Sequence, residues 1–115
     1  MLFRSGLDQC LFVYSMNEWK DFSAKLAELS MGQSESRAFN RFLLGGAVEV
    51  DVDASGRILI PDFLKGFASL GSKVIVTGVY NRVELWNEKA WKAYTTQVEK
   101  EADVLAQKIG EIGMI

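Results

Sequence analysis

Hydrophobic and polar positions repeat along this chain with an offset of 72 residues. The matched positions are apolar or aromatic, apart from one glycine and one Trp-Lys pair in each copy. A fixed offset of this kind indicates two copies of one structural unit. The matches pair Leu2-Phe3 with Val74-Ile75, Gly6-Leu7 with Gly78-Val79, Leu11 with Val83, Val13-Tyr14 with Leu85-Trp86, Trp19-Lys20 with Trp91-Lys92, Phe22 with Tyr94, and Leu26 with Val98.

Apolar residues at spacings of three and four predict a series of helices. The first follows Ser15, because the Ser15 hydroxyl and the Glu18 carboxylate can form a capping box. The second begins at Ser34 and ends at Gly45-Gly46, and a short third helix spans residues 62–68 behind Pro61. The faces expected to be buried hold Trp19, Phe22, Leu26 and Leu29 in the first helix, and Ala38, Phe39, Phe42 and Leu43 in the second.

A last helix is predicted from about Glu88 to Ile109, with Asn87 as its cap. Its apolar stripe leaves two interpretations open, a coiled-coil seam for a partner or a core-facing, half-exposed helix. Three periods are short for a coiled coil, so the second interpretation is favoured. The stripe consists of Tyr94, Val98, Ala102, Leu105, Ile109 and Ile112.

Extended segments complete an α+β pattern. Residues 7–14 are apolar and aromatic enough for a strand, and residues 73–79 and 82–86 predict a hairpin that turns at Tyr80-Asn81. Three valines alternate with three acidic residues over residues 48–53, a period of two that predicts a half-buried strand with an acidic outer face. A turn at residues 54–56 follows, and residues 57–60 resume extended structure.

Composition places the chain among soluble, globular, cytoplasmic proteins. About half of its 115 residues are apolar, and no apolar run is long enough to span a bilayer. The first residues do not resemble a signal peptide. Cys10 stands alone and is expected to be a buried thiol. The net charge of −2 does not exclude nucleic acid, because an assembly can gather its cations on one face.

The sequence offers few residues suited to catalysis. We therefore do not expect an enzyme, a cofactor or a small-molecule substrate. The chain has no His and one Cys, and its glycines lack the spacing of a phosphate-binding loop. Glu49, Asp51 and Asp53 share one face of the predicted strand and could bind a hard cation. Alternating charges on a strand are more often its solvated face, which is the interpretation favoured here.

The segment from Asp53 through Gly56-Arg57 to Pro61 resembles the swapped-hairpin transcription factors of the AbrB type. With the 72-residue repeat, the chain resembles the MraZ family still more closely. That resemblance divides the chain into residues 1–33, a remnant of a first AbrB-like unit, and residues 34–115, a complete second unit. The phrases that carry it are residues 6–14 (GLDQCLFVY), 17–19 (NEW), 37–42 (RAFNRF) and 56–61 (GRILIP).

The resemblance implies a swapped-hairpin, double-split β-barrel with flanking helices. It implies a DNA-binding regulator of the bacterial division and cell-wall gene cluster, associated with the nucleoid. Such a protein assembles into a homo-oligomer, as a ring, on double-stranded promoter repeats and has no membrane partner. The alternative is an antitoxin-like protein-interaction module that has lost strong DNA binding.

The family motif Asp-x-x-x-Arg falls on Asp53 and Arg57. Arg57 offers a planar fork of donors for a phosphate or a guanine edge. Asp53 cannot attract DNA, so we expect it to organise the loop by accepting backbone hydrogen bonds or holding an arginine. From the residues alone the pair reads as an exposed salt bridge; the resemblance favours DNA contact by Arg57, with Ser55 and Gly56 allowing close approach of the backbone.

Four other residues are weighed for a functional role: two are assigned to the core, and the role of the other two is left open. Trp86 and Trp91 could stack on bases, but the repeat matches them with Tyr14 and Trp19, which favours core positions. Arg37 and Arg41 lie one helical turn apart and could face a subunit contact or solvent.

The repeat would place the first copy of the Asp-x-x-x-Arg hairpin before Met1. The sequence therefore reads as an N-terminally shortened form, through a misplaced start codon, a true short form or a fragment. Unpaired strand edges would follow, and we expect the chain to swap its hairpin with a second copy or to associate poorly.

Overall fold

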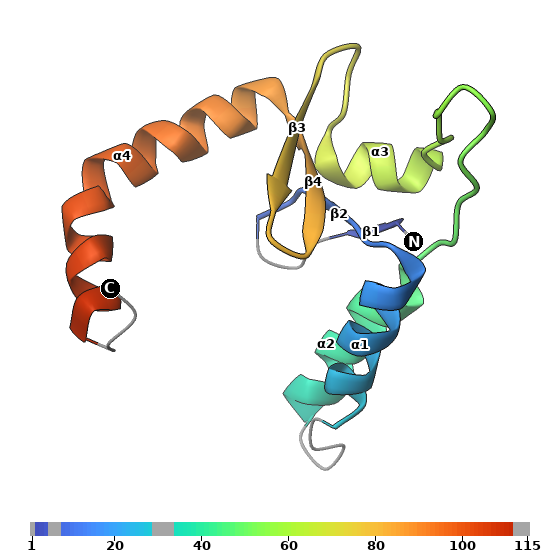
Figure 1. Ribbon diagram of the computed structural model, residues 1–115, viewed down its shortest axis with the longest axis horizontal. Coiled ribbons are helices and arrows are strands. Elements are labelled where there is room, and N and C mark those ends of the chain that lie inside the picture. The colour runs from blue at the N-terminus through green and yellow to red at the C-terminus, as the bar shows by residue number, and fades with distance from the viewer. Residues whose placement is uncertain (1, 5–7, 29–33, 112–115) are drawn as a thin grey trace.

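The computed structural model describes residues 2–4, 8–28 and 34–111. These residues form four strands and four helices, so the α+β content predicted from the sequence is confirmed (Figure 1). In chain order the elements are β1 (Leu2–Arg4), β2 (Leu11–Val13), α1 (Met16–Ala27), α2 (Ser34–Gly45), α3 (Asp62–Ala68), β3 (Val74–Val79), β4 (Arg82–Asn87) and α4 (Glu88–Glu111).

The strands form one antiparallel sheet in the order β1-β2-β4-β3. The predicted hairpin of β3 and β4 is confirmed, and Tyr80 at its turn has a φ of 48°. The predicted strand at residues 7–14 is shorter than expected, since regular pairing covers Leu11–Val13 and residue 7 lies outside the described residues.

The two sequence copies meet in the centre of this sheet. β2 pairs with β4 so that Phe12 is the Cα partner of Glu84, and these residues are equivalent in the 72-residue repeat. Antiparallel pairing of equivalent positions is the arrangement that a local twofold axis produces. The repeat found in the sequence therefore has a structural counterpart.

Local capping signals fix the helix starts. The amide of Glu18 donates to the Ser15 hydroxyl at 3.2 Å, and the amide of Ala90 donates to the Asn87 side chain at 2.9 Å. Pro61 immediately precedes α3, as predicted. The side-chain amide of Asn87 also donates to the Ser69 carbonyl at 2.7 Å, which ties the start of α4 to the end of α3.

Two hydrophobic clusters lie against the sheet. In one, Leu64 and Ala68 of α3 pack on Leu11 and Leu85. In the other, Tyr14 packs with residues of α1 and α2, and burial raises the pKa of its phenol. Cys10, the one cysteine of the chain, is fully buried, as expected from the sequence.

The buried face of α2 differs from the predicted one. Leu43 is buried and Phe42 half-buried, as expected, but Ala38 and Phe39 are exposed. Asn40 is buried instead, and its side-chain amide donates to the carbonyl of Leu26 in α1 at 3.3 Å. Asn40 and Leu43 both lie on the side of α2 that contacts Leu26 of α1.

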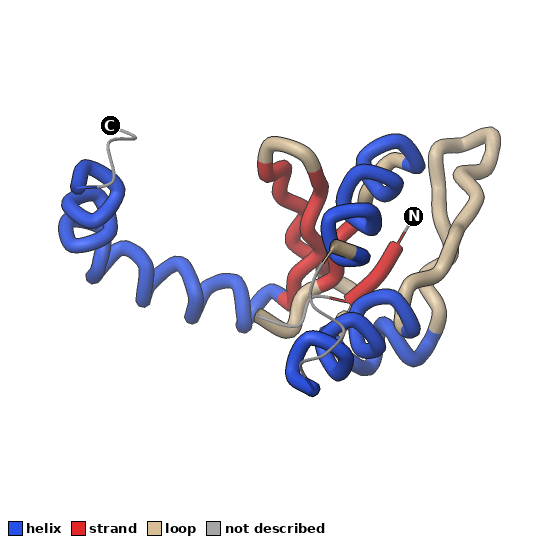
Figure 2. The backbone as a smooth tube through the Cα atoms, turned by 90° about the horizontal axis from the view of Figure 1, so that it is seen from below, coloured by secondary structure: helices blue, strands red, loops and turns tan. Residues whose placement is uncertain are grey.

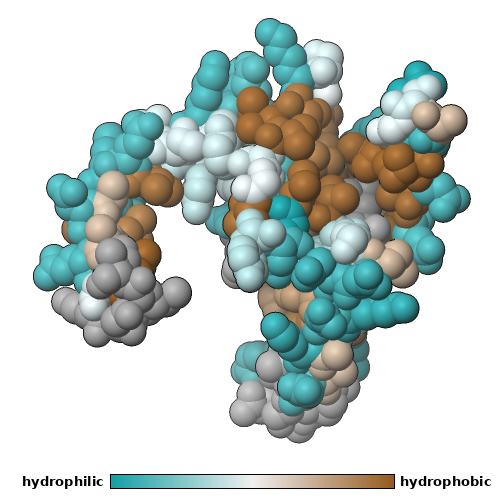
Figure 3. Space-filling view, in the orientation of Figure 1, coloured by the Kyte–Doolittle hydropathy of each residue, from teal (hydrophilic) through white to brown (hydrophobic). Residues whose placement is uncertain are grey.

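Helix α4 leaves the body of the molecule as a curved arm (Figures 1 and 2). Its first part contacts β4 and β3, and residues 101–110 are exposed. Figure 3 shows hydrophobic residues on the inner side of the far part of this arm. None of the helices in the described part of the chain is long and apolar enough to cross a membrane.

Candidate nucleic-acid interface

The loop at residues 53–57 is closed by two backbone hydrogen bonds. The amide of Asp53 donates to the carbonyl of Arg57 at 2.9 Å, and the amide of Gly56 donates back to the carbonyl of Asp53 at 3.0 Å. Gly56 has a φ of 80°, in the region that glycine occupies without steric cost. No atom lies within 4 Å of a Cβ built at Gly56, so the backbone conformation is what requires glycine there.

The Asp53 carboxylate accepts three hydrogen bonds from Ser55 and Arg57 of this loop. Its Oδ1 accepts the amide of Ser55 at 2.9 Å and the amide of Arg57 at 2.8 Å. Its Oδ2 accepts Nε–H of Arg57 at 3.2 Å. The backbone hydrogen bond from Arg57 is the main reason that the pKa of Asp53 lies below its ordinary value, because it stabilises the ionised form.

The Arg57 side chain is displayed at the tip of the loop and is 78% exposed. Its contact with Asp53 uses Nε, and an exposed pair of this kind contributes little to stability. The contact restrains the guanidinium, whose two terminal nitrogens form the edge that recognises phosphate or guanine. Asp53, Ser55, Gly56 and Arg57, the residues singled out in the sequence, therefore lie together in one ordered loop.

The two arms of the loop, residues 48–52 and 57–61, are not the strands that the sequence predicted. Val48 forms an isolated β-bridge, but residues 49–52 and 57–61 belong to no regular strand. Val52 is 66% exposed and Leu59 is 81% exposed. A two-stranded ribbon is marginal without a third strand or a packed face, which explains why the alternating sequence alone does not form one here.

The acidic residues Glu49, Asp51 and Asp53 do not form a cation site in the structure. Glu49 and Asp51 are exposed, and the Asp53 carboxylate is engaged by the loop itself. Within residues 2–4, 8–28 and 34–111, no group of three His, Cys, Asp or Glu side chains could hold a metal ion.

The tryptophan residues take structural positions. Trp86 is buried, and its indole N–H donates to the Glu84 carboxylate at 3.0 Å. Trp91 is half-buried, with its ring centroid 5.3 Å from that of Trp86. The core interpretation is confirmed for Trp86 and agrees with the packing of Trp91.

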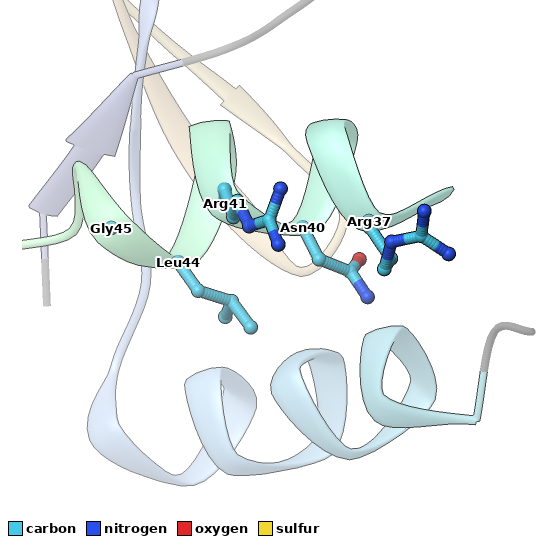
Figure 4. Close-up of a pocket in the computed structure, with 5 residues that line it drawn as sticks. All are labelled: Arg37, Asn40, Arg41, Leu44 and Gly45. Atoms are coloured by element: carbon cyan, nitrogen blue, oxygen red, sulfur yellow. The ribbon is translucent and has the colours of Figure 1, made fainter. Parts of the chain in front are cut away.

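A groove on α2 brings together residues whose role the sequence left open. Arg37, Asn40, Arg41, Leu44 and Gly45 line it, and Figure 4 shows the two arginines on either side of Asn40 along the helix. Arg41 is exposed and Arg37 is half-buried. Sequence spacing could place the two arginines on one helix face, but the groove also depends on how α2 packs against α1.

Comparison with known proteins gives a consistent answer over most of the chain. The family model described as "MraZ protein, putative antitoxin-like" matches residues 2–42 and again residues 43–109. A protein of Natranaerobius thermophilus named "Transcriptional regulator MraZ" is 44% identical over 104 residues, which cover 90% of this chain and 73% of that relative.

Two further relatives carry the same name. The protein of Thermoanaerobacter pseudethanolicus is 43% identical over 109 residues, covering 95% of this chain and 76% of the relative. The protein of Caldanaerobacter subterraneus subsp. tengcongensis is 47% identical over 106 residues, covering 92% and 71%. The double match of the family model and these identities show that the chain belongs to the MraZ family.

Proposed function

We propose that the chain is a DNA-binding transcriptional regulator and that residues 53–57 form its DNA-reading loop. The observation that carries this proposal is an exposed arginine on a loop that is already ordered by hydrogen bonds of 2.8–3.2 Å to Asp53. A preorganised donor fork loses little conformational freedom on binding, which favours recognition of a phosphate or a guanine edge. The names of the relatives support a role in transcription.

Each loop residue has a separate role in this proposal. Arg57 contacts DNA, and Asp53 holds the loop and the Nε edge of Arg57. Ser55 and Gly56 provide the small tip that lets the backbone approach the duplex. The target is double-stranded promoter DNA with short repeated sites in the division and cell-wall gene cluster, as the family resemblance implies.

We further propose that the exposed arms at residues 48–52 and 57–61 pair with the arms of another unit. The exposed side chains of Val52 and Leu59 and the lack of regular pairing in these arms support this. Pairing of two hairpins would complete a swapped-hairpin barrel and build a homo-oligomer, as a ring. Residues 1–33 and residues 34–115 would then belong to two related AbrB-like units.

A second candidate function rests on the same arms. Exposed, extended apolar segments can bind another protein by adding a strand to its sheet, as an antitoxin-like module would. This reading also fits the antitoxin-like description of the family model. It differs in one respect that can be measured, because partner binding would not require Arg57.

Fluorescence anisotropy with labelled promoter DNA tests the leading proposal. Arg57→Ala should weaken binding at least about tenfold, the size expected for one lost arginine–base contact. Lys100→Ala removes the same charge from an exposed site on α4, outside the loop and the groove on α2, and serves as the matched control. Binding by the wild type should fall steeply with salt. Equal losses for the two variants, or no binding at low salt, would exclude Arg57 as the specific contact.

A further inference from the structure

The groove on α2 is formed by one face of that helix. Its lining residues recur at helical spacings of three and four, and Figure 4 shows their side chains on one side of α2. They are Arg37, Asn40, Arg41, Leu44 and Gly45. The groove has a volume of about 500 Å³, which falls within the range of small-molecule sites. It runs for roughly 12 Å along the helix, at a rise of about 1.5 Å per residue.

One end of the groove carries two positive charges. Arg37 and Arg41 lie one helical turn apart, a spacing at which like charges repel. Arg41 forms no ion pair with any residue that the structure describes. Basic residues stabilise the last turn of a helix, but α2 has none there and has Arg37 close to its start. The helix itself therefore does not favour this placement, whereas an anion bound by both guanidinium groups would relieve their repulsion.

The other end of the groove is apolar and open. Leu44 is 38% exposed although its side chain is large and apolar. No described atom lies within 4 Å of a Cβ built at Gly45, so there is free space beside the helix at this point. Asn40 lies between the two ends, and its hydrogen bond to the Leu26 carbonyl of α1 restrains the middle of the groove. The groove therefore offers a cationic end and an apolar end on one restrained helix face.

These features define the chemistry of a ligand. Two guanidinium groups, each a planar fork of donors, match the three oxygens of a phosphate dianion better than the two oxygens of a carboxylate. The exposed side chain of Leu44 favours a ligand whose phosphate is joined to an apolar group. Figure 1 shows α2 and the loop at residues 53–57 at different ends of the molecule. The groove therefore suits a small molecule rather than the duplex that the loop is proposed to read.

We propose that the groove on α2 binds a small phosphate monoester that carries an apolar group. Arg37 and Arg41 donate hydrogen bonds to the phosphate oxygens. Leu44 and the free space beside Gly45 receive the apolar group. The loop at residues 53–57 and its arms contribute nothing to the groove, so this binding does not depend on the proposed DNA contact.

Isothermal titration calorimetry of the full chain with phenyl phosphate and with inorganic phosphate tests this inference. Phenyl phosphate should bind about fivefold more tightly, because only its ring reaches Leu44. Arg41→Ala should weaken the binding of both probes about tenfold, the size expected for lost charge-assisted hydrogen bonds. Leu44→Ala should abolish the preference for phenyl phosphate and leave inorganic phosphate unchanged. Lys100→Ala removes a positive charge from an exposed site on α4 and should change neither affinity.

Circular dichroism on the three variants checks that their helix content is unchanged. Equal affinities of the wild type for the two probes would overturn the inference, as would no binding of phenyl phosphate at millimolar concentration or full affinity in Arg41→Ala. A loss of duplex binding in Arg41→Ala as large as in Arg57→Ala would assign the groove to the DNA backbone and would also overturn it. Wild-type affinity of Arg57→Ala for phenyl phosphate supports the inference whether or not that variant binds DNA.

Discussion

Phe12 and Glu84 are Cα partners across β2 and β4, and they occupy equivalent positions in the two sequence copies. Arg82 connects them, because its guanidinium lies 4.3 Å from the centroid of the Phe12 ring and 2.8 Å from the Glu84 carboxylate. Glu84 also accepts the indole N–H of Trp86. A charged network thus joins the two units where their strands meet.

Glu84→Ala should lower the free energy of unfolding by about 2–3 kcal/mol. The substitution leaves a half-buried guanidinium and a buried indole N–H without their acceptor. Urea denaturation followed by tryptophan fluorescence measures the loss. Glu99→Ala, an exposed position on α4, is the matched control and should change stability by less than about 0.5 kcal/mol. Equal effects for the two variants would show that the network contributes nothing.

Two glycine substitutions should have opposite effects. Gly56→Ala forces a side chain into a left-handed conformation and should cost about 1–2 kcal/mol. Gly66→Ala removes a glycine from inside α3, where a Cβ meets no atom within 4 Å, and should add about 0.5–1 kcal/mol. Urea denaturation of both variants measures the difference. A stabilising Gly56→Ala would contradict the positive φ at the tip of the loop.

The Asp53 carboxyl should titrate below its ordinary value of 3.8, since the backbone N–H of Arg57 stabilises the ionised form. A lowered pKa in the folded protein means that this stabilisation is present above pH 3.8 and is lost as the pH falls through the folded value. Carbon-13 NMR of the side-chain carboxyl measures the midpoint. Arg57→Ala should keep most of the depression, because the largest contribution comes from a backbone donor. A return to 3.8 in that variant would assign the effect to the guanidinium instead.

Local signals predicted much of the fold. Ser15 and Asn87 act within one helical turn, so their caps could be identified from neighbouring residues alone. The turn at Gly56 is equally local. The repeat predicted two related units, but not that β2 and β4 would join them, because strand pairing depends on contacts distant in sequence.

The incorrect predictions also depend on contacts between residues that are distant in sequence. Alternation at residues 48–53 describes the two faces of a paired strand, and within the described residues these arms have no regular pairing. The buried side of α2 was misplaced because Asn40 finds its acceptor on α1, 14 positions away. Asp53 and Arg57 could be chosen from a motif, whereas the groove beside Arg37 and Arg41 depends on helix packing that the sequence does not specify.

The most direct test of the central claim is an NMR titration of the full chain with a promoter duplex. If residues 53–57 read DNA, the amide signals of Ser55, Gly56 and Arg57 should shift most, and a scrambled duplex of equal length should shift them less at the same salt concentration. Arg57→Ala should lose the difference between the two duplexes. Shifts confined to α2 or α4, with the loop signals unmoved, would contradict the account.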